Sequence, residues 1–321
     1  MRQIIIEKND AGQRLDKFMS KRFKTMPSSL LYKYIRRKCV RINGEKVSSA
    51  NRVLYEGDVL SFYIMDEFFS SEPVDDENFL SGISPSFSVV YEDDNIILME
   101  KPVGLLCQAD NREKRNTLDN HLRTYLMRKG EYDPKTEQSF VPALCNRIDK
   151  NTHGIVIGAK NAESLRILND KIKKREIEKK YKCLVFGVPK KREDTITAFL
   201  KKDSEENHVH IISAPDKNGE YKKIITSYKV LDDNGRISLL EVTLHTGRTH
   251  QIRAQMAYLG YPIIGDGKYG KMNLNKDYPF KYQALSACEI SFLFKTSAGC
   301  LDYLKGRTFF IKPFFENIIL F

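Results

Sequence analysis

A buried strand that follows a polar loop is the feature that most restricts how this chain can fold. Residues 155–159 form an apolar run rich in β-branched side chains that ends at Lys160, which predicts a strand inside a sheet. The nine residues before it, 146–154, are mostly polar. Such a loop, anchored to a buried strand, can hold Asp149 still for acid–base or covalent chemistry. It also suits an ordinary turn in which the carboxylate accepts backbone N–H bonds, and this stretch alone favours the turn.

A second polar stretch, 245–253, places two arginines and two histidines in nine positions ahead of a predicted helix. Thr249 is the expected N-cap and Gly260 the expected stop, so that the helix spans 250–259. Apolar residues at 252, 256 and 259 would point inward, and Arg253 would lie beside them near the helix start. An arginine in that position needs a carboxylate partner, because an unpaired buried charge is costly.

The composition fits a globular protein with one large domain and one small one. The chain has 321 residues, of which 41% are hydrophobic and 30% charged, and this is enough for a sizeable core. Six cysteines are scattered without a C-x-x-C pair, so we expect neither a zinc site nor a disulfide framework, and we expect a reducing compartment. No stretch resembles a signal peptide or a membrane span, and the expected location is the cytoplasm.

The net charge of +11 is unevenly distributed along the chain. Residues 1–65 hold fourteen Lys/Arg and six Asp/Glu, whereas residues 66–94 hold nine Asp/Glu and no Lys/Arg. Two basic bodies therefore flank an acidic connector. This pattern fits a polyanionic partner, and it fits a charged, solubilising surface equally well.

The first 65 residues predict two helices followed by a hairpin and a strand. Apolar residues recur at helical spacing over 15–23, and a second helix begins after Pro27. Asn43-Gly44 supplies the positive φ angles of a type I′ turn between two short strands, and a further strand is expected over 59–64. Three cations of the second helix share one face that would suit RNA phosphates, namely Lys33, Arg36 and Arg37.

The rest of the chain predicts a linker and a larger domain. Residues 66–87 combine acidic, Ser and Pro residues with few aliphatic ones, which indicates a flexible linker between a domain over 1–65 and another over 88–321. For the larger domain we expect these elements: strands near 155–159, 181–188, 224–231 and 236–244, helices over 162–175 and 250–259, and a polar insertion over 190–222. The fold class is therefore α+β, a mixed or antiparallel sheet with its site on one edge or in a cleft.

Four stretches of the larger domain, in order, resemble the motifs of the RluA-type pseudouridine synthases. These are KPVG (101–104), NRIDKNTHG (146–154) beside the signature HRLDRxTSG, KY (180–181), and TGRTHQIRAQMAYLGYPIIGDGKYG (246–270). The resemblance covers most of 88–321. In the first domain, GQRLDKFMSKRF…RINGEKV…GDVL resembles a small RNA-binding domain that a small-subunit ribosomal protein shares with many pseudouridine synthases.

The resemblance implies an enzyme that breaks the bond between C1′ of uridine and N1, turns the base and rejoins it through C5, without a cofactor. It implies that Asp149 acts on the ribose, at C1′ or at the C2′ proton, and that Arg253 keeps it ionised. Tyr181 would stack on the flipped uracil, although a strand tyrosine is commonly core filling. The residues expected to contact substrate or RNA are Arg147, Arg248, His250, Gln251, Leu285 and Lys101, together with Lys33, Arg36 and Arg37.

Three residues depart from the family pattern. Asn146 stands where histidine is usual, Lys150 where arginine is common and His153 where serine is usual. None of them replaces the aspartate. We expect them to alter the hydrogen bonding of the loop and the choice of RNA.

The expected partner is RNA, and the additional N-terminal module favours large-subunit ribosomal RNA over transfer RNA. We expect a monomer that binds no membrane and no metal, because neither histidine pair, 208/210 or 245/250, has the carboxylate or thiol neighbours of a zinc site. Two other functions stay open. One is a non-catalytic RNA-binding or ribosome-assembly factor, and the other is a glycosidase that leaves abasic sites.

Overall fold

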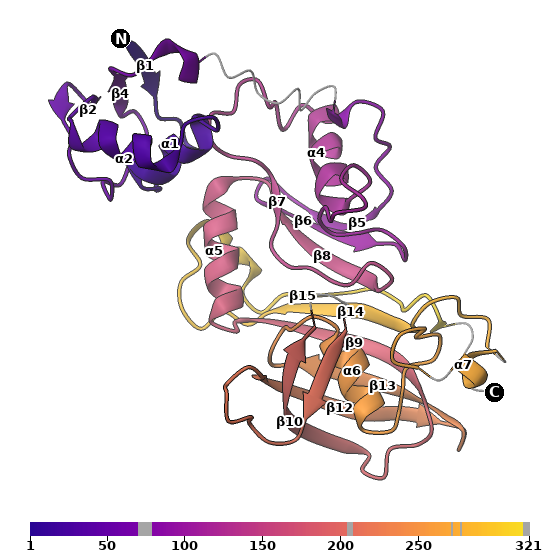
Figure 1. The fold of residues 1–321 in the computed structure, drawn as a ribbon. Coiled ribbons are helices and arrows are strands. Elements are labelled where there is room, and N and C mark those ends of the chain that lie inside the picture. The colour runs from indigo at the N-terminus through magenta and orange to yellow at the C-terminus, as the bar shows by residue number, and fades with distance from the viewer. Residues whose placement is uncertain (70–78, 204–207, 271, 277, 317–321) are drawn as a thin grey trace.

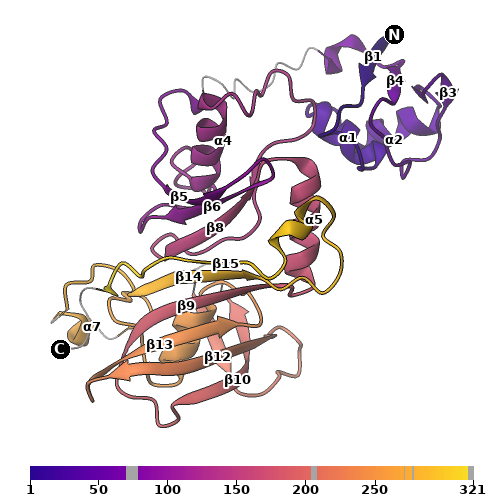
Figure 2. The ribbon, with the colours of Figure 1, turned by 180° about the vertical axis from the view of Figure 1, so that it is seen from behind.

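The computed structural model describes residues 1–69, 79–203, 208–270, 272–276 and 278–316 (Figure 1). Its strands form a four-stranded sheet near the N-terminus and an eleven-stranded sheet in the rest of the chain. Each sheet packs on its own cluster of buried apolar side chains. In both views the N-terminal unit lies at one end of the molecule, beyond α5 and α4 (Figures 1 and 2).

The N-terminal unit contains the two predicted helices and the predicted hairpin. Its elements are α1 (Leu15–Arg22), α2 (Ser28–Arg36), β2 (Val40–Ile42), β3 (Glu45–Lys46) and β4 (Val59–Phe62). The φ angles of Asn43 and Gly44 are 51° and 85°, as a type I′ turn requires. The sequence did not predict β1 (Arg2–Ile5), which pairs antiparallel with β4 and gives the order β1-β4-β2-β3.

The expected linker, 66–87, is described only at its two ends, and residues 70–78 lie outside the described residues. At one end η1 (Asp66–Phe68) packs Phe68 on the N-terminal core, and at the other end Leu80 and Ile83 are buried. The two units also touch directly. Asn9 Nδ2 donates to Glu137 Oε1 at 2.7 Å, and Gln138 Nε2 donates to the Ile5 carbonyl at 2.9 Å.

The larger sheet is mixed, with the order β11-β10-β12-β13-β9-β14-β8-β6-β5, and β15 and β7 pair with β14 and β8. Its β14–β8 pairing is parallel and the others are antiparallel. The mixed α+β class predicted from the sequence is confirmed. The strands are β5 (Ser88–Glu92), β6 (Ile96–Lys101), β7 (Ala143–Leu144), β8 (His153–Ala159), β9 (Ile177–Phe186), β10 (Glu193–Lys202), β11 (Val209–Ile212), β12 (Lys222–Asp233), β13 (Ile237–Leu244), β14 (Leu285–Phe292) and β15 (Thr308–Phe310).

Helices cover both faces of this sheet. One face carries α4 (Leu118–Arg128) and α6 (Gln251–Tyr258), and the other carries α5 (Ala162–Lys173) and η2 (Gly299–Leu304). The short helix α7 (Met272–Asn275) follows α6. In the described residues no helix is long and apolar enough to cross a membrane.

The run 155–159 is apolar because β8 is buried on both sides. Val156 packs in the cluster with α4, whereas Ile155 and Ile157 pack in the cluster with α5, as expected for a central strand. Gly154 lets β8 begin close to β14. Its φ is +134°, and a Cβ there would lie 2.4 Å from the carbonyl oxygen of Ala287, so a larger residue would push the two strands apart.

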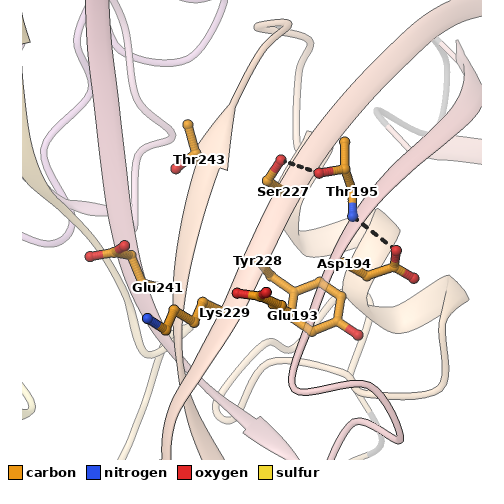
Figure 3. A pocket seen from close by; sticks show the side chains of 8 residues that line it. All are labelled: Glu193, Asp194, Thr195, Ser227, Tyr228, Lys229, Glu241 and Thr243. Carbon is orange, nitrogen blue, oxygen red and sulfur yellow. Dashed lines mark hydrogen bonds between the residues drawn. The ribbon is translucent and has the colours of Figure 1, made fainter.

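The stretch predicted as a polar insertion, 190–222, is instead partly sheet, since it contains β10 and β11. β10 alternates between more and less buried side chains in the structure, but the consecutive apolar residues 198–200 hid this period of two in the sequence. On the exposed face of β10, β12 and β13, polar side chains line a hollow of about 400 Å³ (Figure 3). Thr195, Ser227 and Thr243 form one cross-strand row in this hollow, and Glu193, Lys229 and Glu241 form the next. Lys229 lies between two carboxylates, so the charges in this row are balanced by cross-strand neighbours. We therefore interpret the hollow as a solvated face of the strands and not as a binding site.

Candidate active site

The loop before β8 presents the Asp149 carboxylate to a cleft. The backbone forms a turn in which the Thr152 N–H donates to the carbonyl of Asp149 at 3.0 Å. The turn therefore uses the main chain and leaves the carboxylate free for other partners. That side chain is 25% exposed and lines the cleft. The turn and the functional interpretation of this loop are thus compatible.

Arg253 lies beside this carboxylate, as the second motif predicted. Its Nη1 donates to Asp149 Oδ2 at 3.0 Å, across 104 positions of sequence. The guanidinium side chain is only 9% exposed. Burial opposes its charge, but hydrogen bonds and attraction from Asp266 and Asp149 outweigh burial and raise the pKa of Arg253 above its ordinary value. The arginine is therefore a permanent cation next to Asp149.

Asp266 is the functional residue that the sequence interpretation missed. Its two carboxylate oxygens accept from Nε and Nη2 of Arg253 at 2.7 and 3.0 Å, and the residue is fully buried. Burial disfavours the carboxylate, but Arg253 outweighs this and lowers the pKa of Asp266. The bidentate pair fixes the plane of the guanidinium, so that Nη1 points at Asp149. The available signal was an aspartate between two glycines, Gly265 and Gly267, inside the last motif.

The start of α6 differs from the prediction. The N-cap is His250 rather than Thr249, with φ 53° and ψ 18° and no capping hydrogen bond from its side chain. His250 Nδ1 lies 2.8 Å from the hydroxyl of Tyr269, and His250 Nε2 lies 3.9 Å from Asp149 Oδ2. Burial lowers the pKa of His250 to about 4 despite the nearby Asp149. The imidazole is therefore neutral at pH 7. The predicted stop is confirmed, since Gly260 has φ 88°.

Tyr181 and Leu285 form an apolar part of the cleft wall. They lie on the neighbouring strands β9 and β14 and belong to the core cluster under α4 and α6. Tyr181 is 6% exposed and Leu285 is 3% exposed, yet both line the cleft. Burial raises the pKa of the Tyr181 hydroxyl, which is therefore protonated. This surface offers a flat ring and an aliphatic neighbour to a base.

Two of the predicted RNA contacts are instead buried supports. Lys101 is fully buried, and its ammonium donates to the carbonyls of Pro102, Leu105 and Lys150 at 2.8–2.9 Å. Lys101 thereby links Lys150, the residue after Asp149, to the end of β6. Burial lowers the pKa of Lys101 to about 8. An ammonium with three carbonyl acceptors and no exposed surface has no donor to offer to RNA.

Gln251 is the second such support. It is 2% exposed. Its Oε1 accepts from the Arg248 N–H at 3.1 Å and from the Thr246 hydroxyl at 3.0 Å, and its Nε2 donates to the Thr226 hydroxyl at 2.9 Å. Gln251 therefore shapes the loop that carries Arg248, and this placement does not support a direct contact with RNA.

Two of the residues that depart from the family pattern also have structural partners. Asn146 Oδ1 accepts from the Ile157 N–H at 2.8 Å. His153 is buried between Ser286 Oγ, at 3.0 Å from Nδ1, and Glu100 Oε1, at 2.9 Å from Nε2. Both hold the ends of the Asp149 loop against the sheet.

The cleft is large and basic. Its volume is about 1110 Å³, and eight Lys/Arg line it against three Asp/Glu. Arg147 and Arg248 are exposed and line the cleft, where the predicted contact with RNA is sterically open to them. On the N-terminal unit, Lys33, Arg36 and Arg37 are exposed on α2 and its C-cap. A polyanion is the ligand that this charge balance fits.

In the described part of the chain, no group of three His, Cys, Asp or Glu side chains is arranged to hold a metal ion. The rings of histidines 208 and 210 are in tilted contact with centroids 5.2 Å apart, and His208 makes a tilted contact with Tyr269 at 4.6 Å. These rings pack beside the cleft.

Known proteins match this chain over most of its length. Residues 95–258 match the model of the RNA pseudouridylate synthase family. The chain is 33% identical to an uncharacterized RNA pseudouridine synthase of Mycoplasma capricolum, over 98% of both proteins. It is 30% identical to ribosomal large subunit pseudouridine synthase C of Buchnera aphidicola, over 84% of this chain and 81% of that protein. The human RNA pseudouridylate synthase domain containing 4 has a similar fold, with a TM-score of 0.54 at 19% identity over 70% of this chain and 88% of the human one.

These matches and the cleft together indicate an enzyme that modifies RNA. The chain belongs to the RNA pseudouridine synthase family, as its RluA-type motifs predicted.

Proposed function

We propose that the protein isomerises uridine to pseudouridine in structured RNA of the large ribosomal subunit, in the cytoplasm and without a cofactor. The observation that carries the proposal is the contact of Asp149 with Arg253, at 3.0 Å inside a basic cleft. The preference for ribosomal RNA is supported by the relative named for the large ribosomal subunit and by the basic face of α2. Residues 1–65 would act as the RNA-binding module in this scheme.

The reaction needs only groups that the cleft offers. The C1′–N1 bond breaks, the uracil turns, a C1′–C5 bond forms, and the proton of C5 leaves while N1 gains one. Atoms and electrons balance without an oxidant. Asp149 would act on the ribose, either as a nucleophile at C1′ or as a base for the C2′ proton. Arg253 pairs with the carboxylate and fixes its direction.

The detached base must be held while it turns. The ring of Tyr181 and the side chain of Leu285 form the surface for stacking, and the target nucleotide must be flipped out or unpaired to reach it. The neutral His250 lies beside the carboxylate. Because the Tyr269 hydroxyl already accepts from the Val209 N–H at 3.1 Å, its own proton is available to His250 Nδ1. The imidazole proton is then on Nε2, directed at Asp149 and the ribose.

A direct test uses unmodified large-subunit ribosomal RNA transcribed with C5-tritiated uridine. The wild-type protein should release tritium into water, and Asp149→Ala should release none while it binds the RNA within a few fold of wild type, because affinity comes mainly from contacts to phosphate. Binding without release by the wild type, on this RNA and on transfer RNA, would favour a non-catalytic factor. Strand scission at abasic sites would favour a glycosidase.

A further inference from the structure

Most lysines that are strongly desolvated in this structure have partners within the protein. Lys101 donates to three carbonyl groups. Lys171 donates to Glu176 at 2.8 Å and to Thr296, and Lys160 pairs with Glu92 at 2.9 Å and with Glu131. This is the expected rule, because an ammonium that leaves water needs compensating acceptors.

Lys179 breaks this rule. It is partly buried on β9, and burial lowers the pKa of its ammonium. Among the described residues no carboxylate pairs with it and no acceptor takes a hydrogen bond from its side chain, and burial is the only influence on its pKa. Glu178 is next to it in sequence and also lines the cleft, but it forms no ion pair with Lys179. The Lys179 ammonium therefore lines the cleft with its hydrogen-bond donors free for a ligand.

Lys179 lines the cleft near the proposed stacking surface. Lys179 and Tyr181 are two residues apart on β9, with Cα atoms about 6.6 Å apart. Both line the cleft, together with Lys173 and Arg175 from the end of α5. The next residue, Lys180, is not among the residues that line the cleft and pairs with Glu289 at 3.1 Å.

We propose that the Lys179 ammonium binds the RNA phosphate next to the flipped uridine, and this inference rests on the proposed function. When the uracil stacks on Tyr181, the adjoining phosphate of the same strand lies about one nucleotide away, a distance comparable with the spacing of the two side chains. The phosphate supplies the missing acceptors. Lys173 and Arg175 extend the positive track for the strand that leaves the site.

The test compares Lys179→Gln with Lys180→Gln, which removes the same charge from the neighbouring position of the same strand. The probe is an unmodified transcript of large-subunit ribosomal RNA, and filter binding is measured over a series of KCl concentrations. Lys179→Gln should weaken binding about tenfold and lower the slope of log K against log salt by about 0.7–0.9, as expected for one lost phosphate contact. Lys180→Gln and Lys179→Arg should keep the wild-type slope. Equal slopes for wild type and Lys179→Gln would overturn the proposal.

Urea unfolding of the free variants separates a ligand site from a structural lysine. Because the unpaired ammonium is a cost in the free protein, Lys179→Gln should unfold at the same urea concentration as wild type or at a higher one. A clearly lower midpoint would mean that Lys179 stabilises the fold, and this would contradict the assignment.

Tritium release separates this proposal from the proposed function. Lys179→Gln should raise KM and leave kcat at saturating RNA within a few fold of wild type. If the wild-type protein releases no tritium but Lys179→Gln still lowers the salt slope, the reaction assignment fails while the phosphate contact stands. If release is normal in wild type and KM is unchanged in Lys179→Gln, the phosphate site fails alone.

Discussion

Replacing Asp266 by asparagine removes the charge that holds Arg253 in place. The two residues form a bidentate pair at 2.7 and 3.0 Å, and their side chains are 0% and 9% exposed. Removing one partner of a buried ion pair costs about 3–5 kcal/mol. The asparagine side chain would keep one acceptor oxygen, so we expect the free energy of unfolding to fall by about 3 kcal/mol. Arg253 would also lose its fixed plane, and a displacement of that kind reduces turnover on the order of a hundredfold.

The assay is urea unfolding together with tritium release from C5-labelled RNA. The control is Asp170→Asn, which removes the same charge from an exposed pair with Lys174 at 2.7 Å. That change should cost less than about 1 kcal/mol and leave turnover unchanged. If Asp266→Asn were as stable and as active as this control, the idea that Asp266 positions Arg253 would be refuted.

The Asp266–Arg253 pair also predicts how the stability of the protein changes at low pH. The pKa of Asp266 is lower in the folded protein than in the unfolded chain, so the unfolded chain binds the proton first. The stabilisation is therefore complete above the unfolded pKa, about 4, and is lost as the pH falls through the folded pKa. Below pH 4 the stability of wild type should fall more steeply than that of Asp266→Asn.

Four further changes test other parts of the structure. Tyr181→Phe should bind RNA like wild type and keep a stacking ring, whereas Tyr181→Ala should lose about 1–3 kcal/mol of stacking in the binding of the flipped base, measured as KM for tritium release. Gly154→Ala should lower the free energy of unfolding by about 3 kcal/mol, because its Cβ would lie 2.4 Å from the Ala287 oxygen; an unchanged urea midpoint would contradict the close strand approach. The pKa of His250 is lowered to about 4 in the folded protein. The free energy of unfolding of wild type should therefore decrease as the pH falls from about 6.5 towards 4. In urea unfolding over the same pH interval, His250→Gln should lose less stability than wild type. Neutralising the basic face of α2 should reduce the salt dependence of RNA binding without changing kcat at saturating RNA; the residues to replace by glutamine are Lys33, Arg36 and Arg37.

Much of the fold follows from patterns that have one physical cause. The run 155–159 is buried on both sides of a sheet, and this alone accounts for its composition. Asn43-Gly44 has the backbone angles that its two residue types favour. The pairing of Asp149 with Arg253 was predicted because an arginine at the edge of a buried helix face needs a carboxylate, and because the two motifs occur together in one family.

The errors arose where a side chain's environment depends on distant segments. Lys101 and Gln251 are polar residues within functional motifs, but carbonyls and hydroxyls from other strands surround them, and periodicity does not reveal such partners. Threonine is a common N-cap residue, so Thr249 was predicted as the N-cap. In the structure the N-cap is His250, which contacts Tyr269, and the helix starts one residue later than predicted. Asp266 stands between two glycines in the last motif, and only the folded chain brings it to Arg253.

The central claim is that the Asp149 carboxylate, and no other acid in the cleft, acts on the ribose. Asp149→Asn keeps the shape of the side chain and removes its charge. Asp110→Asn is the matched control, because Asp110 lines the same cleft but is exposed and accepts only from the N–H groups of Arg112 and Glu113 among the described residues. In a single-turnover measurement on C5-tritiated ribosomal RNA, with enzyme in excess, we predict no release by Asp149→Asn and wild-type release by Asp110→Asn. Wild-type release by Asp149→Asn would contradict the account.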